Sequence, residues 1–362
     1  MTRLRTISRF VVGLAARRGG WVEKSSLTPM ASIWRTSVKK VIFLSLVLAI
    51  LAPAIAGAIP LDVRFSIDPA SPSIQPPNPN NTNITPDDVL RAGPVVHTQG
   101  RALGLQDDFF RGRFDNLNAL SYGVDPIINP LFFSVDRVAV GKEGSDVNRL
   151  AKPGVEDAAR HVYMALPPVG TNRLFIDETQ LGLRQGFFGD DLNALSFLSG
   201  PDTYFSIDAL SASIGKVVIP GQPGVRPSDI LSSTGNGSFG IFKRAENIGL
   251  HPFDEIDALV LDAAGIALFS LSPFSPSIFT DPDSYDACVK GFLSPADICR
   301  TDFSGSFSFW ASADDLGLLR GDNVNALATL APTIPIPEPG SLVLLSSGIV
   351  AMLAWRRRRR QC

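Results

Sequence analysis

The sequence is poor in the residues that most often build catalytic and metal centres. Its 362 residues include only three histidines, His97, His161 and His251. Their spacing assembles no Ser/His/Asp or metal triad, so we expect each to be an ordinary surface or loop residue. The GxSxG, HExxH, Walker and dinucleotide-binding motifs are absent as well. These absences remove the enzyme classes that such motifs identify, and we expect a protein that is not an enzyme.

Charge is missing from two long runs, one near each end of the chain. The first, VIFLSLVLAILAPAIAGA at residues 41–58, follows Lys39 and Lys40 and ends in small residues. This pattern predicts a secretory signal peptide and helix over residues 1–58. Because Met30 begins a normal basic leader, MASIWRTSVKK, we expect the true start there. An uncleaved N-terminal anchor is the alternative.

The second uncharged run covers residues 341–355 and precedes five consecutive arginines. An apolar run backed by a positive cluster stops in a membrane with the cluster on the cytoplasmic side, which predicts a transmembrane helix here. Fifteen residues make about 22 Å of helix, which is shorter than a ~30 Å hydrocarbon core. Such a short span suits a transient anchor. A proline-rich stalk at residues 331–339 precedes it.

The tail from 337 to 362 resembles the PEP-CTERM sorting signal of Gram-negative bacteria. The matching residues are Pro337, Glu338, Pro339, the apolar run, and Arg356, Arg357, Arg358, Arg359 and Arg360. In that family an exosortase processes the exported protein near the Pro-Glu-Pro. The resemblance therefore implies export with signal peptidase and exosortase as partners, transient anchoring in the inner membrane, and delivery to the cell surface or medium. An ordinary C-terminal anchor is the alternative.

The part between the two ends is acidic. Residues 59–335 contain 19 Lys and Arg against 33 Asp and Glu, a net charge of −14. A field of this sign repels nucleic acid and anionic lipid, so we expect neither as a partner. This part also holds two cysteines, Cys288 and Cys299, with no CxxC motif and no histidine nearby. In an oxidising compartment we expect them to form a disulfide rather than a metal or redox pair.

Internal repetition dominates residues 61–330. Four landmarks recur in one order: Phe-Ser-x-Asp, an acid opening an apolar run, Leu/Ile-Gly-Leu, and an acid-rich motif ending in Ala-Leu. The first starts at Phe65, Phe133, Phe205 and Phe269. The second starts at Asp88, Asp229 and Asp297, with Asp157-Ala158 as a degraded copy. The last starts at Asp115, Asp190, Asp254 and Asp322. They divide the chain into four units of about 68 residues, 61–130, 131–202, 203–266 and 267–330.

The elements inside each unit are typical of strands, and the fold class predicted is all-β. In the third unit, residues 256–261 and 266–271 flank a tight Gly-containing turn and predict a β-hairpin. Helix candidates such as residues 155–164 fall only in insertions. The first strand of the domain lacks the hairpin partner that precedes each internal copy, and the last strand lacks the partner that follows. If these two strands pair, the repeats close into a four-bladed β-propeller. An open β-repeat array is the alternative.

Recurring acids are the one polar constellation. One repeat position carries Asp115, Asp190, Asp254 and Asp322, and the position three residues later carries Asn118, Asn193, Asp257 and Asn325. Oxygen donors at such spacing suit Ca²⁺, and the candidate ligands are the acids Asp115, Asp190, Asp254, Asp257 and Asp322. The competing interpretation is that they form turns by capping their own backbone. We favour the turn, because every copy must make it, and we expect no cofactor, with Ca²⁺ as the alternative.

Two functions fit these features. The first is an exported cell-surface or extracellular-matrix protein without a catalytic site, serving a structural, adhesive or polysaccharide-associated role. The second is a secreted propeller-type hydrolase or lyase that acts on polysaccharide with acids at the centre of the ring. The repeat also resembles an uncharacterised bacterial surface repeat of the form DIDAL…G…LFSxD, and this resemblance supplies no activity.

Overall fold

The computed structural model describes residues 63–74, 84–108, 113–122, 130–152, 158–185, 189–198, 202–218, 220–279 and 293–329. The predicted signal peptide, stalk, sorting signal and transmembrane segment lie outside these ranges. Within the described ranges, which belong to the repeat domain, no helix is long and apolar enough to cross a membrane.

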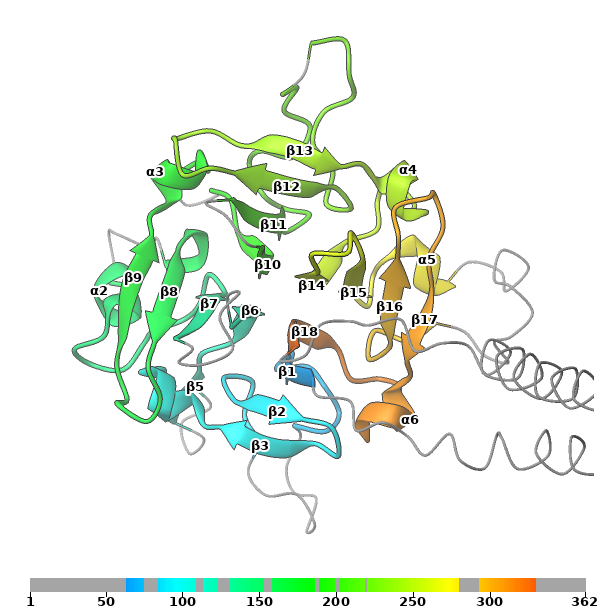
Figure 1. Ribbon diagram of the computed structural model, residues 1–362. Helices are drawn as coiled ribbons and strands as arrows, with labels where there is room; N and C mark the ends of the chain where they lie inside the picture. The colour runs from blue at the N-terminus through cyan, green and yellow to red at the C-terminus, as the bar shows by residue number, and fades with distance from the viewer. Residues whose placement is uncertain are drawn as a thin grey trace, which may run out of the picture. The chain divides into compact units, whose positions relative to one another are not determined.

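Four antiparallel sheets of four strands each surround a central axis (Figure 1). Blade 1 contains β18 (Val324–Thr329), β1 (Val63–Ile67), β2 (Val89–Arg91) and β3 (Val95–Thr98). Blade 2 contains β6 (Leu117–Ser121), β7 (Leu131–Val135), β8 (Val162–Ala165) and β9 (Asn172–Ile176). Blade 3 contains β10 (Leu192–Phe197), β11 (Thr203–Ile207), β12 (Ile230–Ser233) and β13 (Gly240–Lys243). Blade 4 contains β14 (Ile256–Leu261), β15 (Ala267–Leu271), β16 (Ile298–Thr301) and β17 (Ser308–Ala311).

Short elements join these strands. A two-stranded sheet is formed by β4 (Asp107–Asp108) and β5 (Arg113–Phe114). The helices are η1 (Gly100–Leu103), α2 (Asp146–Leu150), η3 (Ala158–Arg160), α3 (Glu178–Leu181), α4 (Ala245–Ile248), α5 (Pro276–Phe279) and α6 (Ala313–Leu316). The helix expected over residues 155–164 is wrong, because Val162–Ala165 form strand β8 and only Ala158–Arg160 form a short 3-10 turn. Pairing with β7 and β9 decides the conformation of this segment.

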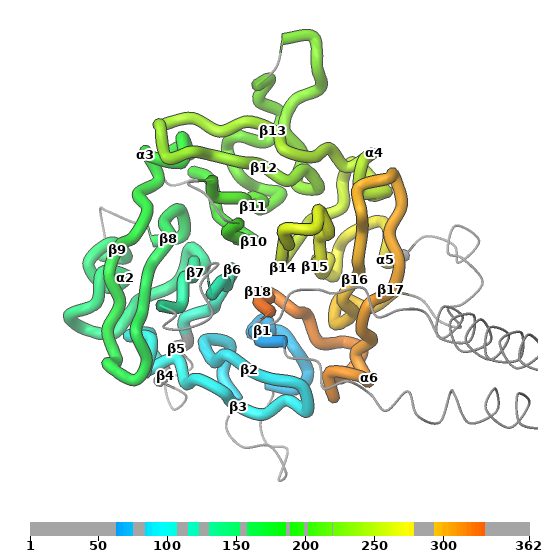
Figure 2. Tube along the Cα trace, viewed as in Figure 1, coloured from blue at the N-terminus to red at the C-terminus, as the bar shows by residue number. Residues whose placement is uncertain are grey.

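The ring is closed by its two terminal strands, and this confirms the propeller. Strand β1 pairs with β18 in antiparallel fashion, with Phe65 opposite Leu327 and Ser66 opposite Ala326. Figure 2 shows the blue and the red-orange ends of the described domain side by side. Each blade takes its inner strand from the end of one sequence unit and its other three strands from the next. The open array, which would leave β1 and β18 without each other, is therefore excluded.

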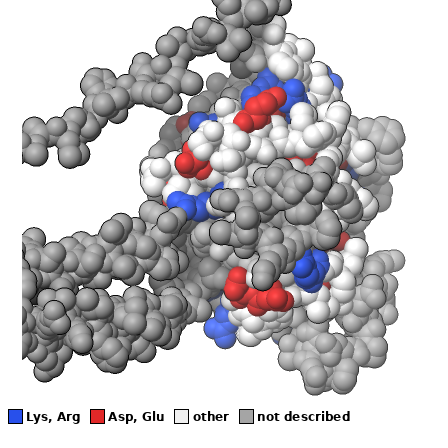
Figure 3. Space-filling view, turned by 90° about the vertical axis from the view of Figure 1, so that its right-hand side faces the viewer, with Lys and Arg blue, Asp and Glu red and all other residues white. Residues whose placement is uncertain are grey.

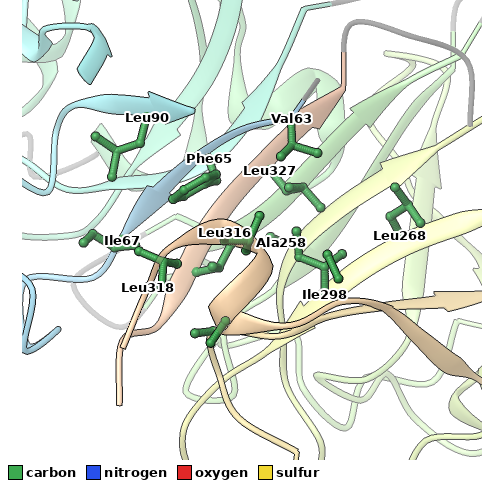
Figure 4. Close-up of a cluster of buried hydrophobic side chains, with 14 of the residues drawn as sticks. Val63, Phe65, Ile67, Leu90, Ala258, Leu268, Ile298, Leu316, Leu318 and Leu327 are labelled. Carbon is green, nitrogen blue, oxygen red and sulfur yellow. The ribbon is translucent and has the colours of Figure 1, made fainter. Parts of the chain in front are cut away.

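Hydrophobic cores fill the spaces between neighbouring blades. Each of four clusters contains one phenylalanine from the Phe-Ser-x-Asp landmark, and all four are buried: Phe65, Phe133, Phe205 and Phe269. The cluster between blades 4 and 1 is drawn in Figure 4, where Phe65 lies with Leu316 and Leu327. Nearly every residue in the second strand of each blade is buried, including the serine that follows the landmark phenylalanine.

The glycine of the Leu/Ile-Gly-Leu landmark fixes the contact between adjacent blades. Gly249 ends α4 with φ of 91°, in the left-handed region that glycine occupies without steric cost. A Cβ atom at this position would lie 2.7 Å from the Cα atom of Ser306 in the next blade. Gly104, Gly182 and Gly317 meet their following blades in the same way. The glycine of the landmark therefore permits a close approach to the next blade, and this contact repeats around the ring.

Candidate functional site: the central channel

A bulge in every inner strand turns one polar side chain toward the axis of the ring. The pairing of each inner strand with its neighbour skips one residue, which shifts the register at the same place in all four blades. Bulges of this kind re-aim a side chain and bend the strand. We call the four skipped residues the polar ring: Asn118, Asn193, Asp257 and Asn325.

The polar ring lines a central cavity of about 800 Å³. Three further sets of equivalent positions line the same cavity. Two residues before each ring residue stand Asn116, Asp191, Glu255 and Asn323. At the ends of the second strands stand Asp68, Asp136, Asp208 and Ser272. Two residues farther on stand Ala70, Val138, Leu210 and Phe274. The cavity is thus built almost entirely from repeated positions, and the blades differ in which of them carry an acid.

Side-chain hydrogen bonds join the blades around this cavity. Asn325 Nδ2 donates to Asn118 Oδ1 over 3.0 Å, and Asn118 Nδ2 lies 3.5 Å from Asp191 Oδ1. Asn193 Nδ2 donates to Asp257 Oδ1 over 2.9 Å, and Asn323 Nδ2 donates to Asp257 Oδ2 over 2.8 Å. Every pair of neighbouring blades is therefore bridged, and the polar ring links all four sheets.

Six carboxyl groups share the cavity with a single cation among the described residues that line it, Arg137. The Arg137 Nε atom lies 3.0 Å from Asp191 Oδ2, and its Nη2 atom lies 3.5 Å from Asp208 Oδ1. The other four acids form no ion pair with the described residues that line the cavity. Carboxyl groups therefore outnumber basic groups six to one among the described residues that line the cavity.

Burial dominates the electrostatics of these acids. It raises the pKa of Asp191 to about 7, although Arg137 opposes the rise. Burial likewise raises the pKa of Glu255 to about 7, and the Asp208 charge adds to the effect. The pKa of Asp136 also rises to about 7, first because of burial. Burial and the neighbouring Glu255 charge raise the pKa of Asp257 well above its usual value. A carboxylate removed from water is less stable than the neutral acid, which accounts for the common direction.

Exposed apolar side chains rim the cavity. We call Ala70, Val138, Leu210 and Phe274 the collar; the exposed fractions of the last three are 74%, 79% and 86%. The side of the ring in Figure 3 is different: where described residues are visible, small acidic and basic groups lie among uncharged ones. The channel mouth thus combines exposed apolar groups with a buried acidic floor.

The first acid of each Ala-Leu motif anchors loops by accepting hydrogen bonds from them. The carboxylate of Asp190 accepts hydrogen bonds from the backbone N–H groups of Arg184 and Ser213, both 2.7 Å, and from the Ser213 hydroxyl. Asp254 and Asp322 each accept the equivalent three hydrogen bonds, two from backbone N–H groups and one from a serine hydroxyl. Asp115 accepts hydrogen bonds from backbone N–H groups of the two equivalent loops. These four acids anchor turns, whereas the fifth calcium candidate, Asp257, belongs to the polar ring. Calcium binding by these acids stays a prediction.

His161 shows where sequence reasoning failed. It lies in a bend before β8, but its side chain is 1% exposed, so it is not the surface residue that we expected. His161 directly precedes β8, just as Asp229 precedes β12. The Nδ1 atom of His161 accepts a hydrogen bond of 3.1 Å from the backbone N–H of Glu178 at the start of α3. Asp229 Oδ1 accepts the N–H of Ala245 at the start of α4 in the same way. The second landmark in blade 2 is therefore His161, while Asp157 lies outside the described residues.

Among the described residues, one group of three His, Asp and Glu side chains has potential ligand atoms close enough together for a single metal ion, and it lies outside the channel. The potential ligand atoms of His161, Asp177 and Glu178 all lie within 4.8 Å of one another. His161 Nδ1 lies 2.9 Å from Glu178 Oε2, and Glu178 also accepts a hydrogen bond from Gln185. These contacts explain the group as the blade 2 form of the strand-to-helix link.

The disulfide between Cys288 and Cys299 stays a prediction, because Cys288 lies outside the described residues. Cys299 is buried in β16.

Comparison with known proteins identifies the tail. Among the curated proteins, none matches this chain. The solved structures include a similar chain described as YCF48 bound to D1 peptide, with 12% identity and a TM-score of 0.23, covering 53% of this chain and 40% of that one. This chain thus spans less than half of that protein, and so low a score supports no conclusion. A family model described as the PEP-CTERM protein-sorting motif matches residues 335–359. The chain therefore carries a PEP-CTERM protein-sorting motif, which implies export and sorting by an exosortase.

Proposed function

We propose that this protein is a non-catalytic binding protein of the cell surface or extracellular matrix, and that the channel mouth binds polysaccharide. The collar supports this most directly. Val138, Leu210 and Phe274 occupy one repeat position in successive blades, and each exposes most of its side chain. Single exposed apolar residues are ordinary, but an exposed apolar group around one cavity is typical of an interaction surface.

The chemistry of the mouth suits a sugar polymer. The C–H faces of sugar rings pack on apolar and aromatic side chains, and their hydroxyl groups donate to carboxylate and amide oxygens. The collar offers the first kind of contact, and Asp68, Asp136 and Asp208 at the ends of the second strands offer the second. An anionic polymer would meet repulsion from these acids, so a neutral or amine-bearing polysaccharide is the better fit.

A specific observation also keeps the hydrolase or lyase as a second candidate. A general acid works best when its pKa lies near the working pH, and burial places the pKa values of Asp191 and Glu255 at about 7. Against this, both acids stand at repeated positions that carry asparagine in other blades. We therefore favour binding without catalysis.

The test is a screen of the purified chain against neutral, amine-bearing and anionic polysaccharides, read both as retention and as release of reducing ends. We expect retention of a neutral or amine-bearing polymer without cleavage. Phe274→Ser should weaken retention about tenfold or more, and Phe253→Ser should not, because Phe253 is 74% exposed but does not line the cavity.

Equal loss of binding in both variants, or no retention of any polymer, would contradict the binding proposal. Cleavage that disappears in both Asp191→Asn and Glu255→Gln would instead establish the second candidate. A polymer that binds equally well to the collar variant would place its site elsewhere on the protein.

A further inference from the structure

We propose that the polar ring and its neighbours bind one Ca²⁺ ion on the axis of the propeller. This inference concerns the inside of the channel and does not depend on the polysaccharide proposal. Of the oxygen donors that the sequence suggested for Ca²⁺, it keeps only the position of the polar ring, because Asp115, Asp190, Asp254 and Asp322 anchor turns.

Each asparagine of the channel donates its NH₂ group to an oxygen of the protein, so a ligand would meet oxygen atoms; of these, Asn118 Oδ1 already accepts from Asn116 and Asn325. Asn325 Nδ2 donates to the backbone oxygen of Leu117 over 3.2 Å, and Asn193 Nδ2 donates to that of Ile256 over 3.2 Å. A backbone carbonyl can only accept, so these contacts fix which end of each amide is nitrogen. The NH₂ groups of Asn116, Asn118 and Asn323 also point to oxygen atoms of neighbouring side chains.

Two of the oxygens have no partner in the described part of the chain. Asn116 Oδ1 and Asn323 Oδ1 are buried and accept no hydrogen bond, and their residues are 4% and 6% exposed. Leaving a buried acceptor unsatisfied is costly, so such atoms call for a bound group. Both residues line the cavity beside the acids, and each has already committed its NH₂ group. The missing partner of these two oxygens must therefore be a cation or a hydrogen-bond donor.

The surrounding charge favours a cation over a neutral donor. Asp191 and Glu255 occupy the same repeat position as the two asparagines, and Asp257 belongs to the polar ring beside them. Arg137 is the one basic residue among the described residues that line the cavity. The donor set consists of carboxylate and amide oxygens, with no histidine or cysteine among the described lining residues. Oxygen-only sets select hard cations over the transition metals.

Ca²⁺ fits this set better than Mg²⁺ does. Ca²⁺ accepts six to eight oxygens in irregular geometry, whereas Mg²⁺ requires a near-octahedral set and keeps much of its water. The oxygens come from two repeat positions in each of the four blades, and carboxylates and amides are distributed unevenly around the axis. Because every blade contributes, the site exists only when β1 and β18 close the ring.

The experiment uses the purified full chain, freed of metal with chelator and then titrated with CaCl₂, MgCl₂ or NaCl at matched ionic strength. Calorimetry should find one Ca²⁺ site per chain. At 100 times the dissociation constant, Ca²⁺ should raise Tm by roughly 5–10 °C, because it binds only the folded ring. Mg²⁺ should bind at least tenfold more weakly.

Two variants test the assigned residues with side chains that the fold already accepts. Asp257→Asn installs the residue of the other three blades at this position, and it should weaken Ca²⁺ binding at least tenfold. Asn116→Asp installs the residue that blade 3 carries as Asp191, and it should tighten Ca²⁺ binding. Asp314→Asn, an exposed acid on α6, is the matched control and should leave binding unchanged.

Each alternative outcome overturns the proposal. No binding heat and no calcium-dependent change in Tm for the parent chain would refute the site. A loss of binding in Asp314→Asn equal to that in Asp257→Asn would show diffuse attraction to an acidic protein. Weaker binding in Asn116→Asp would exclude the oxygens around Asn116 as ligands of the ion. A preference for Mg²⁺ would exclude a Ca²⁺ site.

Discussion

Closure of the ring by β1 predicts that a mutation at one end of the domain destabilises all of it. The decisive substitution is Phe65→Ala in β1. Phe65 is fully buried between blades 4 and 1, where it packs in one cluster with Leu90, Leu316 and Leu327. Phe133, Phe205 and Phe269 occupy the same repeat position in the other blades and are buried to within 1% of the same extent. The repeat therefore supplies three internal controls of identical chemistry.

The expected magnitude follows from this burial. Replacing a buried phenylalanine by alanine typically costs about 3–5 kcal/mol, from lost transfer free energy and the cavity left behind. For a domain of this size each kcal/mol lowers Tm by roughly 2–4 °C, so Phe65→Ala should lower Tm by roughly 6–20 °C. Because the ring is closed, Phe205→Ala in the middle of the chain should have an effect of similar size.

Urea unfolding followed by circular dichroism measures the free energy, and hydrogen exchange with mass spectrometry shows where it is lost. In Phe65→Ala, exchange should accelerate in β10–β13 on the opposite side of the ring as well as in β1–β3. The reasoning is refuted if exchange rises only in blade 1 while blade 3 keeps the parent rates. That pattern belongs to an open array, in which each repeat depends on its neighbours alone.

Two further predictions concern the acids of the channel and the tail. In chelator-treated protein, Tm should fall as pH rises from about 5 to about 8, because burial raises the pKa values of Asp136, Asp191 and Glu255 to about 7. Between the unfolded and folded pKa values the native state binds more protons than the unfolded chain, so the free energy of unfolding declines as pH rises through this window. For Asp191 alone, the rise in pKa from 3.8 to about 7 corresponds to a loss of ~4 kcal/mol at most. Thermal scans should show a flatter profile in Asp191→Asn, and a parent Tm that rises with pH would contradict the assignment. In the tail, Glu338→Ala or neutral residues at 356–360 should disturb processing and surface delivery, and cell fractionation that finds these variants sorted like the parent would exclude the sorting role.

Local patterns in the sequence determined the number, order and type of the repeated elements. Three copies of Phe-Ser-x-Asp, a fourth copy with Ser272 in place of the Asp, and four copies of the Ala-Leu motif were enough to predict hairpins, because alternation and turn chemistry act over a few residues. Ring closure could also be predicted, since β1 and β18 each lacked the neighbour that every internal copy has. The sorting tail was equally local, because Pro337-Glu338-Pro339 and the arginine cluster need no fold to be recognised.

Only the tertiary structure decided what the repeated acids do. Within one motif, Asp254 anchors a turn while Asp257, three residues later, points into the channel, and a register shift of one residue makes that difference. His161 was misjudged because its role depends on the position of α3, which is 17 residues away. The collar was missed because Val138, Leu210 and Phe274, although all apolar, are different residue types of different size. They come together only because closure of the ring brings the same loop of every blade to one mouth.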